Sequence, residues 1–322
     1  MGAPTLSDVG ESGLIARILE RIDTAPDVLI GVGDDAAVVA SPGERLVYTT
    51  DTLVEGVDFE LGYARGYDVG WKTMAANVSD LAAMGARPCH ALVTVAAPGE
   101  LELALFDDLL EGLLAAGERW GARLVGGDIS GARQLAVTVA LVGVPGARGV
   151  VARAGAEVGD VLCVTGTLGG AAGGLLALRA GCGPEHPELV ARQLRPLARL
   201  DEGLALAGKA RAMIDISDGL AIDLDRLLGP DLGCALDLDA LPIDPALQRL
   251  PGALPLELAL TGGEDLELLC ALPPGRVGEA AAALAGGAGL SVIGRVTEGA
   301  KRIGDQDLGT WKEAAWEHLR SP

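Results

Sequence analysis

Thr49-Thr50-Asp51-Thr52-Leu53-Val54-Glu55-Gly56-Val57 is the most informative stretch of this sequence. It opens at the end of the apolar run Leu46–Thr50, which is typical of a β-strand. Asp51 is therefore expected at the point where a strand ends. Because ligands of α/β folds bind in the crevice outside the strand ends, an acid in that place is a candidate binding residue.

The rest of the first half alternates between helical and strand-like patterns. Apolar residues recur on one helical face over Asp68–Met84 and over Leu101–Trp120. Strands are predicted over Ala91–Ala96, Ala122–Val125 and Leu135–Val144. Several strands combined with two long helices predict an α/β or α+β layer.

The run Pro145-Gly146-Ala147-Arg148-Gly149 is the best candidate for a linker, because the pattern restarts after it. A chain of 322 residues is long enough for about two domains. We expect an N-terminal domain over 1–148 and a C-terminal α/β domain over 149–322. In the second domain, helices are predicted over Leu200–Ala210, Leu220–Leu228 and Val277–Leu284, and strands over Asp160–Thr165, Cys234–Leu238, Leu266–Leu272 and Leu290–Val296.

The charge of the chain limits its partners. Lys and Arg number 25 against 45 Asp and Glu, which gives a formal net charge of −20. A surface this acidic disfavours nucleic acid and anionic membranes. The apolar stretch between Arg133 and Arg148 is too short to span a bilayer. No signal peptide is visible and the five cysteines form no Cys-x-x-Cys pair, so we expect a cytoplasmic protein with reduced thiols and neither zinc nor redox chemistry.

Two glycine motifs resemble nucleotide-binding loops, and both are disfavoured. Gly31–Ala36 fits a relaxed dinucleotide fingerprint, but Asp34 and Asp35 would repel a pyrophosphate and no long helix follows. Gly203–Ala210 almost spells a Walker A loop. Its last residue, Ala210, lacks the hydroxyl that binds Mg²⁺, and the segment lies within a helical Leu/Ala pattern.

Acidic residues at or near the ends of apolar segments are the stronger signal. They are Asp34, Asp51, Asp80, Asp128, Asp215 and Asp218. Hard oxygen ligands in that number suit Mg²⁺ bridging a polyphosphate. Each can also be an ordinary turn former or, for Asp218, the N-cap of the helix at Leu220. Asp80 differs because it lies in the last turns of a helix, where the macrodipole disfavours a negative charge unless a cation is near.

Taken in order, a set of segments resembles the thiamine-monophosphate kinase family, within the superfamily that includes aminoimidazole ribonucleotide synthetase. The segments are Gly10-Glu11 with Leu14-Ile15, Gly33–Ala36, Thr49–Val57, Asn77–Pro88, Gly126–Asp128, Arg153, Asp215–Leu220 and Gly262–Leu268. They cover nearly the whole chain. The Thr49–Val57 run especially favours this family over its relatives.

The resemblance implies a two-domain fold of the aminoimidazole ribonucleotide synthetase type, with a mixed-sheet N-terminal domain that pairs in a homodimer and an α/β C-terminal domain that completes the nucleotide and substrate sites. It implies ATP-dependent phosphorylation of thiamine monophosphate to the diphosphate, with several Mg²⁺ ions. The implied metal ligands are Asp34, Thr49, Thr50, Asp51, Asp80, Asp128, Asp215 and Asp218. The implied ATP contacts are Gly127, Asp128, Arg153 and Ser217, and the implied substrate contacts are Asp58, Glu264 and Trp316.

The chain departs from the family pattern at two positions. The family commonly has His where this chain has Asp58, and a family aromatic near the nucleotide falls at Leu110, which cannot stack in the same way. Two other functions stay open: an aminoimidazole ribonucleotide synthetase-like ATP-dependent ligase, and a non-catalytic regulator that binds Mg-nucleotide. His90, His186 and His318 form no expected ligand set or triad, and no catalytic base is assigned, because a phosphate monoester is already anionic near pH 7.

Overall fold

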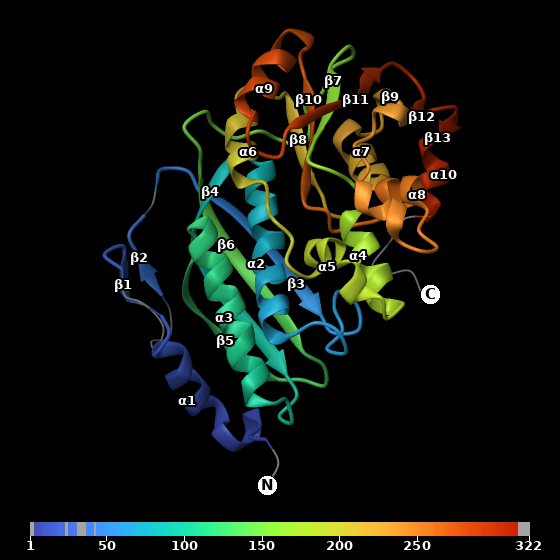
Figure 1. The fold of residues 1–322 in the computed structure, drawn as a ribbon. Coiled ribbons are helices and arrows are strands. Elements are labelled where there is room, and N and C mark those ends of the chain that lie inside the picture. The colour runs from blue at the N-terminus through green and yellow to red at the C-terminus, as the bar shows by residue number, and fades with distance from the viewer. Residues whose placement is uncertain (1–2, 23–24, 31–36, 42, 315–322) are drawn as a thin grey trace. The chain divides into compact units, whose positions relative to one another are not determined.

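The computed structural model describes residues 3–22, 25–30, 37–41 and 43–314 (Figure 1). The chain divides into two compact units. The first comprises Met1–Leu81 and Arg87–Val144, and the second comprises Ala82–Ala86 and Pro145–Pro322. No helix among the described residues is long and apolar enough to cross a bilayer.

The first unit is built on a four-stranded mixed sheet with the strand order β3-β6-β4-β5. Strands β3 and β6 pair antiparallel, whereas β4 and β5 pair parallel. Its elements are α1 (Leu6–Leu19), β1 (Val28–Ile30), β2 (Val38–Val39), β3 (Val47–Val54), α2 (Gly66–Ala83), β4 (Ala86–Ala97), α3 (Leu103–Trp120), β5 (Arg123–Gly131) and β6 (Ala136–Pro145).

Helices α2 and α3 lie side by side against this sheet (Figure 1). Their close approach depends on glycine. A Cβ on Gly70 would lie 2.1 Å from the carbonyl oxygen of Leu109, and one on Gly112 would lie 2.1 Å from that of Tyr67. Since neither contact leaves room for a side chain, α2 and α3 are held at a short, fixed separation.

Two strands of the first unit are longer than the sequence predicted. Strand β3 pairs with β6 from Val47 through Val54, so Asp51 lies inside the strand and not at its end. Strand β5 runs to Gly131 and likewise contains Asp128. The expected strand ends were wrong because Thr and Asp residues can continue a strand when a neighbouring strand supplies the hydrogen bonds.

The second unit has a seven-stranded sheet with the order β13-β12-β9-β11-β7-β10-β8. One apolar cluster joins the sheet to α7, α8 and α10, and a second joins it to α6 and α9. Its strands are β7 (Val161–Thr165), β8 (Ala212–Ile216), β9 (Gly233–Leu236), β10 (Glu267–Leu272), β11 (Leu290–Thr297), β12 (Lys301–Ile303) and β13 (Gln306–Asp307). Its helices are α4 (Gly170–Arg179), α5 (Pro187–Leu194), α6 (Leu200–Leu206), α7 (Leu220–Leu228), α8 (Pro255–Thr261), α9 (Val277–Ala283) and α10 (Leu308–Ala314).

The Walker-like segment Gly203–Ala210 falls in and just after α6, as its Leu/Ala pattern indicated. Helix α7 has the predicted bounds, but its N-cap is Gly219 and not Asp218. Sequence periodicity did not identify α5 or α8, which are short and begin with a proline at the first turn. The dinucleotide-like run at 31–36 lies outside the described residues.

Candidate functional site

Thr49, Asp51 and Asp80 form an oxygen-rich cluster in the first unit. Thr49 and Asp51 share one face of β3, because side chains alternate along a strand and Thr50 lies between them. The hydroxyl of Thr49 donates a hydrogen bond to the Asp80 carboxylate on α2. Asp80 is also hydrogen-bonded through its side chain to Asp51. The structure therefore brings together three of the predicted metal ligands.

The electrostatics of this cluster suit a cation. Partial burial raises the pKa of Asp80, against the hydrogen bonds with Thr49 and Asp51 that lower it. Two carboxyl groups within hydrogen-bond reach ionise together only at a cost unless a proton or a cation lies between them. Carboxylate and hydroxyl oxygens are the donors that Mg²⁺ prefers, so the residues present fit a hard divalent cation.

Asn77 and Asp58 fix the backbone on either side of Asp51. The buried Asn77 side chain accepts a hydrogen bond from the backbone N–H of Asp51 at 3.1 Å. Beyond the strand end, the Asp58 carboxylate accepts from the backbone N–H of Val54 at 2.8 Å, and Lys72 donates to the Asp58 carbonyl at 2.9 Å. Asp58 therefore has a structural role in closing the turn after β3.

Thr50 and Asp128 lie apart from this cluster. The Thr50 side chain is on the opposite face of β3, where its hydroxyl donates to the carbonyl of Val139 at 3.0 Å. Asp128 is in register with Thr94, whose side chain is exposed, so it belongs to the same uncovered face of the sheet. Its carboxylate accepts from Ser130 at 2.8 Å.

The neighbouring Gly127 has a backbone reason for being glycine. A Cβ at Gly127 would lie 1.8 Å from the carbonyl oxygen of Val93 on β4. No larger residue fits unless the two strands separate. Strand packing therefore requires glycine at this position, and the Gly127 backbone is exposed next to the Asp128 carboxylate.

In the second unit, Asp215 through Asp218 form the end of β8 and the loop that follows. Asp215 is buried on the strand, in register with Leu268 of β10. The backbone N–H groups of Ser217 and Asp218 both donate to the buried Asp223 carboxylate at 3.0 Å. Burial raises the pKa of Asp223 to about 6, against the hydrogen bond from Asp218. The side chain of Asp218 is paired with Arg226.

Glu264 stands in the adjoining loop with a left-handed backbone, at φ 70°. That conformation is uncommon for a residue with a side chain and is concentrated at functional sites. The N–H of Glu264 donates to the carbonyl of Ser217 at 2.8 Å. Its carboxylate accepts from the buried Gln193 side chain at 2.7 Å. Ser217 and Glu264, predicted separately, are thus neighbours.

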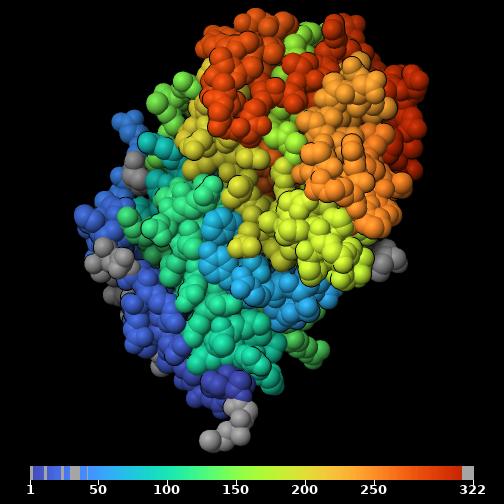
Figure 2. All heavy atoms as spheres, in the orientation of Figure 1, coloured from blue at the N-terminus to red at the C-terminus, as the bar shows by residue number. Residues whose placement is uncertain are grey.

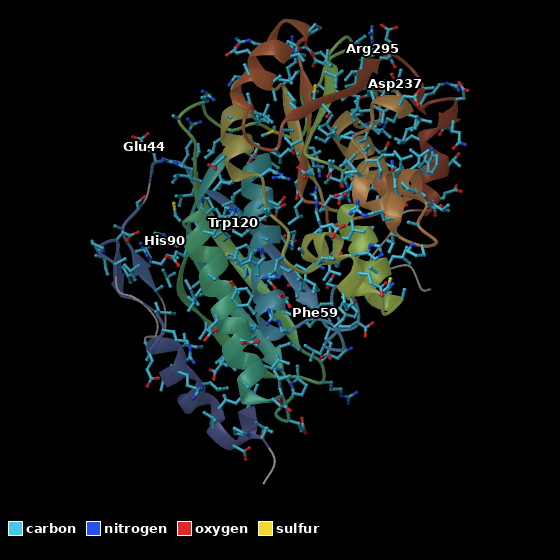
Figure 3. The ribbon with its side chains drawn as sticks, in the orientation of Figure 1. Glu44, Phe59, His90, Trp120, Asp237 and Arg295 are labelled. Carbon is cyan, nitrogen blue, oxygen red and sulfur yellow. The ribbon has the colours of Figure 1, made fainter. Side chains whose placement is uncertain are left out.

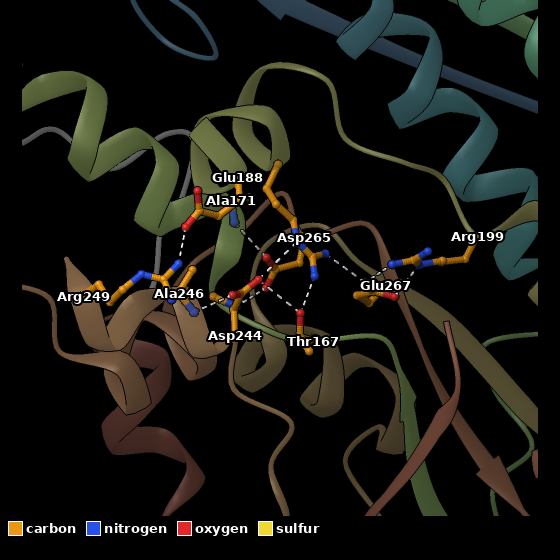
Figure 4. Close-up of polar contacts among 11 residues, drawn as sticks. Thr167, Ala171, Glu188, Arg199, Asp244, Ala246, Arg249, Asp265 and Glu267 are labelled. Carbon is orange, nitrogen blue, oxygen red and sulfur yellow. Dashed lines mark hydrogen bonds and ion pairs between the residues drawn. The ribbon is translucent and has the colours of Figure 1, made fainter. Parts of the chain in front are cut away.

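The residue after Glu264 anchors this loop to α4 (Figure 4). The Asp265 carboxylate accepts from the N–H groups of Gly169 and Ala171 at 2.6 and 3.1 Å. Burial raises the pKa of Asp265 to about 7, although both N–H groups act in the opposite direction. The helix terminus is therefore satisfied by the protein's own carboxyl group.

A buried ion-pair network continues along β10 (Figure 4). Glu267 is fully buried, and its carboxylate accepts hydrogen bonds from Nε and Nη2 of Arg199, each at 2.6 Å. Arg192 also bonds Glu267 at 3.2 Å and pairs with Asp244 at 3.3 Å. Because Arg192 and Gln193 are consecutive on α5, the network fixes the helix that holds the Glu264 side chain.

The remaining predicted residues are placed as follows. Arg153 is exposed in the second unit, whereas Asp34 and Trp316 lie outside the described residues. Asp223 and Gln193 were not predicted as part of any site. Asp223 carries no motif that separates it from other helical acids, and Gln193 meets Glu264 across 71 positions of sequence.

The sequence matches two family models in succession. Residues 33–145 match the N-terminal domain of AIR synthase related protein, and residues 157–305 match its C-terminal domain. The chain is therefore a two-domain protein of the AIR synthase related class.

Comparison with individual relatives shows to which family within this class the chain belongs. The chain is 37% identical over 328 residues to the thiamine-monophosphate kinase of Escherichia coli K12, covering 97% of this chain and 99% of that protein. The crystal structure of thiamine-monophosphate kinase from Stenotrophomonas maltophilia K279a superposes with a TM-score of 0.83 at 34% identity, over 92% of this chain and 96% of that one. A structure of AaThiL complexed with AMPPCP and TMP has a TM-score of 0.74 at 34% identity, over 95% and 96% of the two chains. The chain belongs to the thiamine-monophosphate kinase family.

Proposed function

We propose that this protein transfers the γ-phosphoryl group of ATP to the phosphate of thiamine monophosphate, yielding thiamine diphosphate and ADP. An oxygen of the acceptor phosphate forms the new P–O bond, and the bond between the β–γ bridging oxygen and the γ-phosphorus breaks. Membership of the kinase family supports the reaction, as does the relative described as complexed with AMPPCP and TMP. A cytoplasmic location, where ATP is available, is part of the proposal.

The observation that carries the proposal is the Thr49, Asp51 and Asp80 cluster. In a chain of net charge −20, two polyanionic substrates meet only where cations neutralise them. Mg²⁺, when bound, would offset the phosphate charge and orient the γ-phosphoryl group. Asp51 and Asp80 would hold it, Thr49 would orient Asp80, and Asn77 would keep Asp51 in place. Asp128, beside the open backbone of Gly127, is assigned to the nucleotide phosphates.

The second unit is assigned to the nucleotide and to the thiamine moiety. Glu264 presents a carboxylate from a loop that Gln193 and Asp265 fix, and a thiazolium cation is attracted to such a charge. Arg153 and Ser217 are the remaining proposed nucleotide contacts.

A homodimer is also part of the proposal. Tyr48 and Leu92 are 68% and 46% exposed, although they are large and apolar. Both belong to the face of the sheet opposite to the buried side chains of β3 and β4. Exposed apolar residues grouped on one sheet face favour association with a second surface.

The reaction needs no protein base. The acceptor phosphate is already ionised near neutral pH. His90 is engaged elsewhere, since it is 4% exposed and its Nε2 lies 2.8 Å from the Asp27 carboxylate in the first unit (Figure 3). Positioning and charge neutralisation are therefore the proposed sources of catalysis.

Incubation of the purified chain with ATP, Mg²⁺ and thiamine monophosphate tests this function. We expect ADP and thiamine diphosphate in equal amounts, and no ADP when the acceptor is omitted. Release of inorganic phosphate in place of a phosphorylated acceptor would favour the ATP-dependent ligase. Nucleotide binding without turnover would favour the regulator.

A further inference from the structure

A second group of potential metal ligands lies in the second unit, in the turn between α4 and α5. Cys182, Glu185 and His186 each offer one ligand atom, and these three atoms lie within 4.8 Å of one another. The one-turn 3-10 helix Gly183–Glu185 creates this grouping, because it returns positions i, i+3 and i+4 to one side. The spacing of the cysteines predicted no zinc chemistry, so this ligand set differs from the expectation from sequence.

The turn that carries the group is held by its own backbone. The N–H of Glu185 donates to the carbonyl of Cys182 at 3.1 Å, and the N–H of His186 donates to that of Gly183 at 3.0 Å. The N–H of Cys182 donates to the carbonyl of Ala177 at the end of α4, at 3.0 Å. The three side chains therefore start from fixed positions, which reduces the entropy lost on binding.

His186 provides an independent sign of a ligand. The residue is only 6% exposed, and the Nδ1 atom of its ring has no hydrogen-bond partner among the described residues. A buried ring nitrogen without a partner costs free energy that a metal bond would recover.

We propose that Cys182, Glu185 and His186 bind a borderline-soft divalent cation of the zinc class, at a site separate from the oxygen cluster of the first unit. A thiolate and an imidazole select such a cation over Mg²⁺. Deprotonated Cys182 and ionised Glu185 together balance its double charge. Three protein ligands leave a fourth position for water.

A metal ion can reach this turn from solvent, and the ligand side chains can move to bind it. Glu185 is exposed and Cys182 is partly exposed, while the apolar residues Ala177 and Leu189 pack beneath them. The lime-coloured segment of α4 and α5 lies at the surface in Figure 2. Donor atoms in a tetrahedral zinc site are roughly 3.5 Å apart, given bonds of about 2.0–2.3 Å. Rotation of the exposed Glu185 side chain would bring its carboxylate closer to the other two ligand atoms.

Titration of the full chain with Co²⁺ tests the site, with excess Mg²⁺ present to occupy oxygen-ligand sites. A thiolate bound to Co²⁺ gives a charge-transfer absorption in the near ultraviolet that oxygen ligands do not give. We expect this band to saturate at one equivalent per chain and to disappear when Zn²⁺ is added. Absence of the band would overturn the proposal.

Variants assign the ligands. Cys182→Ser should abolish the band, whereas the matched control Cys89→Ser, which changes another partly exposed thiol, should retain it. Glu185→Gln alters only an exposed side chain and should weaken Co²⁺ binding by about tenfold. A band that survives Cys182→Ser, a band lost in Cys89→Ser, or unchanged affinity in Glu185→Gln would each contradict the assignment.

Discussion

The Thr49 hydroxyl donates to the Asp80 carboxylate and so links β3 to the last turns of α2. Asp80 lies where the helix macrodipole disfavours negative charge, and burial raises its pKa further. The hydrogen bond from Thr49 does not offset both the macrodipole and the burial of the Asp80 carboxylate. The proposed cation site would consist of this pair together with Asp51.

Asp128→Asn should abolish turnover while leaving the fold intact. The substitution keeps the shape of an exposed side chain and removes its charge, so its effect falls on bound phosphates or metal. Steady-state rates at limiting Mg²⁺ measure it. Glu118→Gln, an exposed acid on α3 of the same unit, is the matched control and should behave as wild type. Near-normal activity of Asp128→Asn would remove Asp128 from the site.

Asp58→His should leave turnover within about tenfold of wild type, or ~1.4 kcal/mol of barrier. The structure assigns the Asp58 carboxylate to the Val54 N–H, so we expect the cost to be in stability, at about 1 kcal/mol. Urea unfolding and kcat/KM, measured on the same preparation, separate the two effects. A loss of activity as large as that of Asp128→Asn would instead place Asp58 among the metal ligands.

Glu267→Gln should destabilise the second unit by roughly 3–5 kcal/mol, because it leaves the Arg199 guanidinium group without its buried counter-charge. Glu188→Gln is the control, since Glu188 pairs with Arg249 at the surface, where solvent screens the pair, and its loss should cost far less stability. Urea denaturation of both variants gives the comparison. Equal stability losses would show that the buried network contributes no more than the surface pair.

Asp265 should make the second unit less stable as the pH rises. Its folded pKa of about 7 is above the usual value of 3.8, so the fold favours the protonated form. That contribution is complete below the unfolded pKa and is lost as the pH rises through about 7. The charged groups Arg192 and Glu267 adjoin the Asp265 carboxyl group. Unfolding free energies across that range should fall in wild type and fall less steeply in Asp265→Asn, where Asp223 still contributes, and parallel curves would refute the assignment.

No histidine should be required for catalysis. We expect kcat at saturating Mg²⁺ to reach a plateau above roughly pH 7, as the acceptor phosphate completes its second ionisation. His90→Gln, His186→Gln and His318→Gln should each retain activity within about tenfold. A pH–rate profile of each variant is the measurement. A histidine variant slower by about three orders of magnitude that still binds ATP would require a protein base.

The strands and helices that hold the acids could be predicted from local patterns, because apolar periodicity reflects which face of an element is buried. The faces of β3 could not be assigned in the same way. Thr50 was grouped with Thr49 and Asp51, but strand alternation directs its side chain to the opposite face, and only the paired sheet shows which face α2 covers. Likewise, Asp218 was considered as a helix cap. Its partner in the structure is Arg226, in the last turn of α7.

The site features that local patterns could not predict depend on contacts between segments far apart in the sequence. Gln193 and Glu264 are adjacent only because the ion pairs of Glu267 fix α5 beside the loop. The left-handed backbone of Glu264 follows a glycine in close contact with another loop, since a Cβ on Gly263 would lie 2.5 Å from the carbonyl oxygen of Ser217. No local sequence pattern contains this information.

The most direct test of the central claim is a single-turnover measurement with ATP labelled in the γ-phosphate. In wild type and in Glu118→Gln, the label should appear in the terminal phosphate of thiamine diphosphate. In Asp80→Asn, which removes one charge from the Thr49, Asp51 and Asp80 cluster, transfer should be slower by at least about a hundredfold, or ~2.7 kcal/mol. Label found as inorganic phosphate, or transfer by Asp80→Asn at the wild-type rate, would contradict the account.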